Sequence, residues 1–221
     1  MAKDIIIEVY NRLHKRFGPM NWWPAESDFE VMVGAILTQN TAWTNVEKAI
    51  SNLKKKKMLT PARLKKISVL GLANIIRPAG YFNIKAKRLK SGVAFLFEEY
   101  KGQLSLARGE ETEITRAKLL NVYGIGPETC DSILLYALNK PVFVVDAYTK
   151  RIFSRIGLAD ENSSYENLQS LFMRNLPRRA KLYNEYHALI VQLGKEICSN
   201  KPKCDLCPLS SLCERRGFPA S

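Results

Sequence analysis

The sequence lacks any hydrophobic run long enough to cross a bilayer. Its N-terminal apolar stretch, Ile5-Ile6-Ile7, has charged residues on both sides and is too short for the core of a secretory signal peptide. Binding at a membrane surface would need an amphipathic basic helix or a lipid anchor, and neither stands out. We therefore predict a cytoplasmic protein with no membrane partner.

Acidic residues are scarce relative to basic ones. The chain of 221 residues holds 21 Asp and Glu against 34 Lys and Arg, which gives a formal net charge of +13. Positive potential favours a polyanionic partner, and nucleic acid is the commonest because each neutralised phosphate releases counterions. Solubility or adaptation to heat would explain the same charge. The charge therefore indicates nucleic acid without establishing it.

Runs that alternate between apolar and polar residues, which mark half-buried strands, are missing as well. Nearly every stretch instead has helical periodicity, with short Gly, Pro and Asn segments between stretches. Ser27 and Ser163, each followed three residues later by glutamate, fit the capping box, and Thr60-Pro61 places a cap before a first-turn proline. We predict an all-α protein of one or two domains.

Cysteine is almost confined to one segment near the C-terminus. Of the five cysteines, four lie within sixteen residues, with the spacing Cys198-x5-Cys204-x2-Cys207-x5-Cys213. Such a cluster in a chain without secretory features favours metal ligation over disulfides. Structural zinc sites more often use two close pairs, whereas a compact loop around an iron–sulfur cubane can take its ligands at this spacing. The spacing favours a [4Fe–4S] cluster, with Zn²⁺ as the alternative, and Cys130 is expected to be a small buried filler.

The most informative motif is a G-x-G turn between two apolar helical stretches in residues 119–135. It contains Gly124, Ile125 and Gly126, followed by Pro127 at a first-turn position. Two glycines allow a tight turn and a close approach to another surface. Free amides at the start of the second helix would grip a DNA phosphate without reading sequence. An ordinary αα-hairpin with a glycine turn would show the same residues.

An acidic residue directly follows four apolar positions. Asp146 comes after residues 142–145, eighteen positions beyond Glu128. At the rim of a core, partial desolvation would raise the pKa of the carboxyl group and suit it to acid/base chemistry. By itself such an aspartate would be a helix cap. Only its pairing with the G-x-G hairpin makes it a catalytic candidate.

A basic stretch follows the turn at residues 80–83. Lys85, Lys87, Arg88 and Lys90 follow two aromatic residues of that turn. A solvated helix face and a phosphate-facing loop explain this stretch equally well.

The hairpin and Asp146 together resemble the helix-hairpin-helix DNA glycosylase superfamily, which includes endonuclease III, the adenine mismatch glycosylase and 3-methyladenine DNA glycosylases. The resemblance covers residues 29–213. It implies that Asp146 is the essential aspartate of the site. In such an enzyme the target nucleotide is flipped out of the duplex, and the aspartate stabilises the oxocarbenium-like sugar and orients water.

The same resemblance assigns further residues. The phosphate-gripping amides fall on Gly124, Gly126 and their neighbours Ile125 and Thr129. Gln39 matches the glutamine that wedges into the gap left by a flipped base. The four cysteines resemble the endonuclease III iron–sulfur loop, with a first gap one residue shorter than is usual there.

Glu128 carries the sharpest mechanistic implication of the resemblance. In family members that also cut the strand, a lysine in the helix after the hairpin attacks C1′ and forms a Schiff base. Here that position holds Glu128, and a carboxylate cannot form a Schiff base. The resemblance therefore implies a monofunctional glycosylase that leaves the abasic site uncut, with Asp146 and Glu128 as its two catalytic carboxylates.

The three tryptophans indicate which damaged base the enzyme would excise. Trp22-Trp23-Pro24 resembles a segment of the helix-hairpin-helix 3-methyladenine DNA glycosylases, and Trp43 would add a third wall to a pocket. Indole faces would attract the positive charge of an alkylated base, although ordinary core indoles are the alternative. That subgroup lacks the four cysteines. We predict excision of an alkylated purine such as 3-methyladenine, with an oxidised pyrimidine or mismatched uracil or thymine as the alternative.

For the architecture we expect two helical lobes, with damaged double-stranded DNA and the base pocket between them. One lobe would be a helical barrel of residues 28–139, including the hairpin at 116–138. The other would combine 1–27 with 140–221 and carry the cysteine loop 198–213. We expect a monomer associated with a prokaryotic-type nucleoid. A non-catalytic DNA-binding module and a zinc-containing RNA- or protein-interaction domain are the alternatives of another class.

Overall fold

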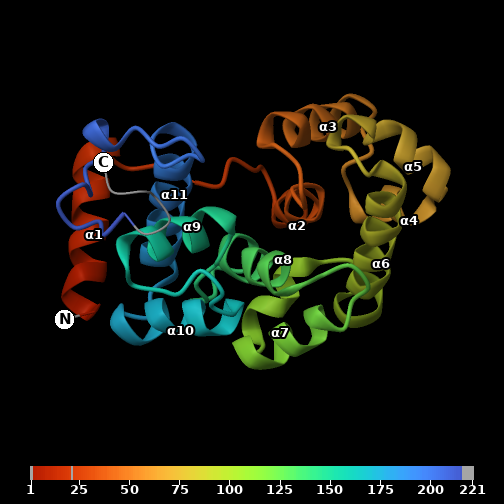
Figure 1. The fold of residues 1–221 in the computed structure, drawn as a ribbon. Coiled ribbons are helices and arrows are strands. Elements are labelled where there is room, and N and C mark those ends of the chain that lie inside the picture. Colours follow the sequence, from red (N-terminus) through yellow and green to blue (C-terminus); the bar gives the residue numbers. More distant parts are fainter. Residues whose placement is uncertain (1, 21, 216–221) are drawn as a thin grey trace. The chain divides into compact units, whose positions relative to one another are not determined.

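The computed structural model describes residues 2–20 and 22–215, and every regular element in these ranges is a helix. The all-α prediction is therefore confirmed (Figure 1). The chain divides into two compact units, one of Met1–Trp22 with Pro141–Ser221 and one of Trp23–Lys140. Within the described part of the chain, no helix has both the length and the apolar character needed to traverse a bilayer.

The unit Trp23–Lys140 is built around helix α2. Its elements are α2 (Asp28–Leu37), α3 (Trp43–Lys55), α4 (Pro61–Lys66), α5 (Val69–Ile75), η1 (Arg77–Ala79), α6 (Phe82–Tyr100), η2 (Leu104–Gly109), α7 (Thr112–Leu120), α8 (Pro127–Ser132) and η3 (Ile133–Ala137). Every residue of α2 from Phe29 to Leu37 is buried, because α3, α6, α8 and η3 pack on its different sides. Gly92 of α6 allows a close helix contact, since a Cβ there would lie 2.6 Å from Cε of Met32.

Helix starts follow the predicted caps in two cases and shift in a third. The Ser27 side chain accepts from the Glu30 amide at 3.2 Å, and Thr60 caps α4, whose first residue is Pro61. The predicted cap at Ser163 is wrong by one residue. Ser164 is the cap of α10, whereas the Ser163 hydroxyl accepts from the Asp160 amide in the preceding turn.

The hairpin consists of α7, a turn over residues 121–126, and α8, which continues into the π-helical turn η3. Gly124 has φ +86, a left-handed conformation that disfavours residues with a Cβ. Gly126 is the residue before α8, and Pro127 occupies the first turn. Ile125 anchors the turn, because only 4% of this residue is exposed. Gly126, the next residue, is exposed.

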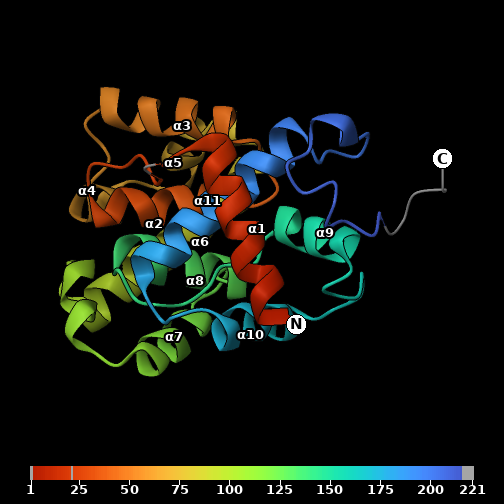
Figure 2. The ribbon, with the colours of Figure 1, turned by 90° about the vertical axis from the view of Figure 1, so that its left-hand side faces the viewer.

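The other unit is centred on α11. Its elements are α1 (Ala2–Phe17), α9 (Ala147–Ile156), α10 (Tyr165–Asn175), α11 (Ala180–Glu196) and η4 (Cys204–Leu206). Helix α1 crosses α11 (Figure 2). The buried Tyr186 hydroxyl donates to the Ile6 carbonyl at 2.8 Å. Aromatic rings fill the core beside this crossing, including Phe143 stacked on Phe172 with ring centres 3.9 Å apart. This core holds α9 and α11 against each other.

Candidate active site and cysteine pocket

Asp146 begins α9 as its cap. One carboxylate oxygen, Oδ1, accepts from the Thr149 amide at 2.7 Å and from the Thr149 hydroxyl at 2.9 Å. The other oxygen, Oδ2, lies 3.6 Å from Nε2 of His187 on α11. The carboxylate is mostly buried, with 13% of the side chain exposed. It is both a helix cap and an anion held by partners on two helices.

The environment of Asp146 lowers its pKa. Burial alone would raise the pKa, but the neighbouring His187 and the two Thr149 donors favour the charged form and outweigh it. The expectation that desolvation raises this pKa is therefore wrong. The sequence could not show that α11 supplies a histidine here. At neutral pH the group is a carboxylate, which suits it to stabilising positive charge and accepting a proton from water.

Gln39 lies against the hairpin in this structure. Its Nε2 donates to the Gly124 carbonyl and to the Thr129 hydroxyl, both at 2.8 Å, and its Oε1 accepts from Arg88. Arg88 also covers the turn, since a Cβ on Gly124 would lie 2.1 Å from its Cγ. The structure thus brings the predicted wedge and the predicted phosphate-gripping turn together. The role of Gln39 as a wedge stays a prediction.

The basic stretch after residue 80 divides into buried and exposed side chains. Lys85 is only 1% exposed, and its ammonium donates to Thr41 and to the carbonyls of Leu37 and Ala79. Burial, with a contribution from Arg88, lowers the Lys85 pKa to about 8. Lys85 therefore holds the segment that carries Gln39, and both alternatives, a solvated helix face and a phosphate-facing loop, are wrong for it, whereas Lys87 is exposed.

Glu128 stands in the first turn of α8 and is exposed. It belongs to the unit Trp23–Lys140 together with Gln39 and the hairpin, whereas Asp146 belongs to the other unit. The side chain offers an oxygen ligand and negative charge but no amine. Its catalytic assignment remains a prediction from the resemblance.

The tryptophans separate into two environments. Trp23 packs edge-on against Trp43, with ring centres 4.9 Å apart, and against Tyr136 at 5.1 Å. Tyr136 comes from η3 and was not predicted, because a lone tyrosine in an apolar helix carries no signal for a pocket. Trp22 belongs to the other unit, where Nζ of Lys195 lies 5.2 Å from the ring centre. Pro24 is exposed.

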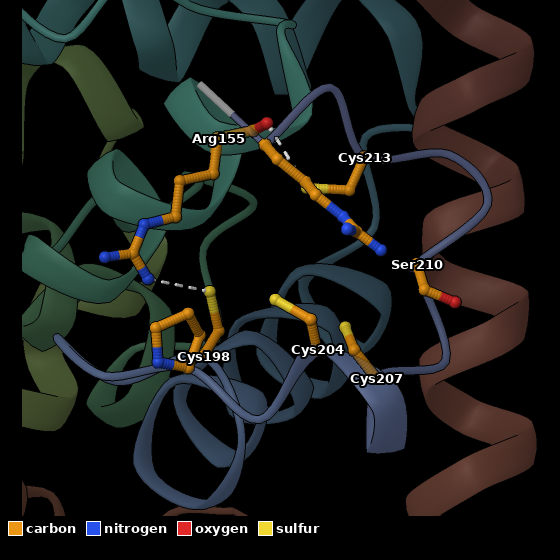
Figure 3. Close-up of a pocket in the computed structure, with 8 residues that line it drawn as sticks. Arg155, Cys198, Cys204, Cys207, Ser210 and Cys213 are labelled. Atoms are coloured by element: carbon orange, nitrogen blue, oxygen red, sulfur yellow. Dashed lines mark hydrogen bonds between the residues drawn. The ribbon is translucent and has the colours of Figure 1, made fainter. Parts of the chain in front are cut away.

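The four C-terminal cysteines line one pocket, whose empty volume is about 370 Å³. Figure 3 shows the sulfur atoms of Cys198, Cys204, Cys207 and Cys213 directed toward a common space. Cys204 and Cys207 share a side because the 3₁₀ turn η4 separates them by three residues. None of the four is in a disulfide, and burial raises the pKa of the Cys207 and Cys213 thiols.

Two arginines of α9 hold the start of this pocket. Arg155 donates to Sγ of Cys198 at 3.2 Å and to the Ser199 carbonyl at 2.7 Å (Figure 3). Arg151, one turn earlier, donates to the carbonyls of Cys198 and Gly194. Sequence reasoning gave these arginines no role, although their spacing of four places them on one helix face.

Four sulfur donors around one space fit a thiolate-ligated group, either an iron–sulfur cluster or zinc. A single tetrahedral Zn²⁺ would draw all four sulfurs to about 2.3 Å from one point. In residues 2–20 and 22–215, no group of three or more His, Cys, Asp or Glu side chains is arranged to hold one metal ion.

Comparison with known proteins gives consistent matches. Residues 33–178 match the model of the HhH-GPD superfamily of base excision DNA repair proteins. A protein of Methanocaldococcus jannaschii, named as a DNA repair glycosylase, is 48% identical over 95% of this chain and 96% of its own length. Endonuclease III of Thermotoga maritima is 29% identical over 98% of this chain and 93% of its own.

Among solved structures, the H. pylori 3-methyladenine DNA glycosylase bound to 1,N6-ethenoadenine is similar to this chain. The sequence identity is 30%, the TM-score is 0.76, and the match covers 88% of this chain and 97% of that one. The likeness therefore extends over nearly the whole of that protein.

Proposed function

Because the chain belongs to the HhH-GPD superfamily of base excision DNA repair proteins, and is an endonuclease III-like DNA glycosylase, we propose that it is a monofunctional one. Its substrate is double-stranded DNA with an alkylated purine such as 3-methyladenine. It hydrolyses the N-glycosidic bond and leaves the strand uncut. It works as a monomer in the cytoplasm, at the nucleoid.

The observation that carries the monofunctional proposal is Glu128 in the first turn of α8. Strand cleavage through a Schiff base needs a neutral amine at C1′, and a carboxylate cannot provide one. Glu128 is exposed, and its carboxyl group leaves this position without an amine.

In the proposed reaction Asp146 supplies the negative charge. As the C1′–N bond breaks, its electron pair leaves with the base and the sugar becomes oxocarbenium-like. Thr149 engages Oδ1 twice, so the attacking water is oriented by the remaining lone pair of Oδ2, beside His187, and gives its proton to that oxygen. The water oxygen then bonds to C1′. The low pKa of Asp146 keeps the carboxylate charged before attack.

The proposed base and DNA contacts use the remaining predicted residues. Trp23, Trp43 and Tyr136 form an aromatic group whose electron-rich faces would attract a cationic alkylated base. The 30% identical structure holds a modified adenine, which supports a purine substrate. Gly124, Ile125, Gly126 and Thr129 would hold the phosphate, and Gln39 would leave the hairpin to enter the duplex.

We further propose that Cys198, Cys204, Cys207 and Cys213 hold a [4Fe–4S] cluster. When bound, such a cluster would supply four metal–thiolate bonds that tie the C-terminal segment together. Arg155 would donate to the Cys198 thiolate, as it does to the sulfur in this structure. Purified protein should be brown, with four irons and little zinc per chain; colourless protein with stoichiometric zinc would refute the cluster.

The function is tested by single-turnover reactions on duplexes that each carry one lesion. The panel includes 3-methyladenine, 1,N6-ethenoadenine, an oxidised pyrimidine, and uracil and thymine mismatches, each analysed with and without hot alkali. Products nicked only after alkali, from the alkylated purines, are expected. Direct nicking would refute the monofunctional proposal, and release of only pyrimidines would refute the base assignment.

One variant completes this experiment. Asp146→Asn should slow base release by roughly 10²- to 10³-fold while DNA binding is retained. If the wild type altered no duplex in the panel, a non-catalytic DNA-binding module would replace the enzyme proposal.

A further inference from the structure

The unit that carries Asp146 also holds a buried histidine, His187. His187 lies on α11 among buried residues and is itself only 6% exposed. Burying an imidazole costs free energy unless a partner compensates, and an apolar side chain would fill the same space. The group within reach of its Nε2 is Oδ2 of Asp146, at 3.6 Å.

The distance between these two groups is set by tight packing of α9 on α11. Gly194 lets Tyr148 pack closely, since a Cβ on Gly194 would lie 2.3 Å from Cδ1 of that ring. Arg151 then ties α9 to the Gly194 carbonyl at 3.0 Å. Contacts from Tyr148 and Arg151, two and five residues beyond Asp146, therefore hold this part of α9 against α11, which carries His187.

The two carboxylate oxygens have different partners. Thr149 engages Oδ1 twice, which fixes the orientation of the carboxylate through the helix start. Oδ2 has the imidazole beside it. An imidazolium there stabilises the anion by charge, and a neutral imidazole can donate one hydrogen bond to it.

We propose that His187 is a positioning residue for Asp146. Its imidazole holds Oδ2 so that the carboxylate stays ionised and aimed during base release. This role rests on the glycosylase function proposed above, since it acts on the same carboxylate.

The other groups near this pair do not replace His187. Of the side chains on α9, Arg151 is bonded to main-chain carbonyls and Lys150 is exposed. From α10, the Tyr165 hydroxyl accepts from the Val145 amide at 3.4 Å. On α11, Lys195 lies over Trp22. His187 and Thr149 are the side chains that favour the charged form of Asp146.

The test compares single-turnover base release by the wild type, His187→Ala and His187→Gln across pH. His187→Ala should lower the maximal rate by about 10- to 100-fold, with little change in DNA affinity, because the lost interaction involves a charged group. The acid limb of its pH profile should move to higher pH, because burial then acts on Asp146 without the opposing imidazole. His187→Gln should restore much of the rate, because its amide can donate to Oδ2.

The chain contains only two histidines, which provides a matched control and a second readout. His14→Ala, on α1, should leave the rate and its pH profile unchanged. In NMR spectra of the full protein, Asp146→Asn should shift the imidazole signals of His187 and leave those of His14 in place.

The outcomes are distinguishable. An unchanged acid limb in His187→Ala, or an Asp146→Asn substitution that leaves the His187 signals unmoved, overturns the proposal even if the enzyme is active. If the wild type excises no base, the glycosylase function fails, and the NMR comparison alone decides whether the pair exists.

Discussion

The two predicted site carboxylates, Asp146 and Glu128, both stand at helix starts, where the helix dipole favours negative charge. Asp146 is the cap itself, with 13% of its side chain exposed and partners on two helices. Glu128 is the second residue of α8 and is exposed. The difference supports the proposal that Asp146 is the reacting carboxylate, whereas the proposed importance of Glu128 is mainly that it is not an amine.

Removing the charge of Asp146 should have the largest effect. Asp146→Asn should slow base release by roughly 10²- to 10³-fold, because the developing positive charge loses its nearest anion. Asparagine is also a good helix cap, so the melting temperature should change little. Parallel single-turnover rates and thermal melts check both expectations, and a comparable rate loss in Glu128→Gln would erase the distinction between the carboxylates.

The start of the Glu128 helix depends on the turn before it. Gly124→Ala should lower the free energy of unfolding by about 2 kcal/mol, since alanine is strained at φ +86 and its Cβ would displace Arg88. DNA affinity should fall as well, because the turn loses its shape. Urea melts and binding titrations measure the two effects. Gly109→Ala is the matched control, since a Cβ there meets no atom within 4 Å.

The hydrogen bonding of the Asp146 carboxylate can be weakened without removing its charge. Thr149→Val deletes the hydroxyl that donates to Oδ1 at 2.9 Å but keeps the backbone amide. Base release should slow about fivefold, for a hydrogen bond worth about 1 kcal/mol. Thr44→Val, at an exposed position of α3, is the control. Equal rates for both variants would mean that the amide alone positions the carboxylate.

The pH dependence of base release is a further test of the role of Asp146. Because the folded environment lowers the pKa of Asp146, this group stays charged as the pH falls below the usual range for aspartate. Base release should therefore stay level from neutral pH down to about pH 5, and the stability that this group contributes should be lost only as the pH falls through its lowered pKa. A rate that already declines between pH 7 and 6 would contradict this assignment.

The smallest effect is expected at Glu128. Glu128→Gln should change base release and stability by no more than about twofold, as is typical of exposed positions. Rate measurements on the substrate identified by the lesion panel test this. A large loss would show that the glutamate itself takes part in base release.

Local features of the structure were predictable and contacts between distant segments were not. The hairpin turn and the caps at Ser27 and Thr60 are local, so sequence patterns reveal them. His187, Tyr136 and Arg88 act through contacts between segments far apart in the chain, and helical periodicity does not say which faces meet. The predicted direction of the pKa shift of Asp146 was wrong for the same reason, since the main partner that stabilises its charged form lies on α11.

The burial of Lys85 is another feature that the sequence does not show. In the sequence it is one of several basic residues in a row, yet only the fold shows that it holds the Gln39 segment through main-chain carbonyls. A charged residue can thus be an internal brace, and its neighbours Lys87 and Arg88 share neither its burial nor its partners.

Borohydride trapping measures directly whether the enzyme forms a Schiff base with C1′. The wild type and Glu128→Lys are compared on a duplex that carries the base which the wild type excises. A Schiff base between an enzyme amine and C1′ is reduced to a stable covalent adduct, which a gel separates from free DNA. We expect no adduct for the wild type and base release at its full rate, because α8 offers a carboxylate at this position. A wild-type adduct formed as fast as the base is released would contradict it.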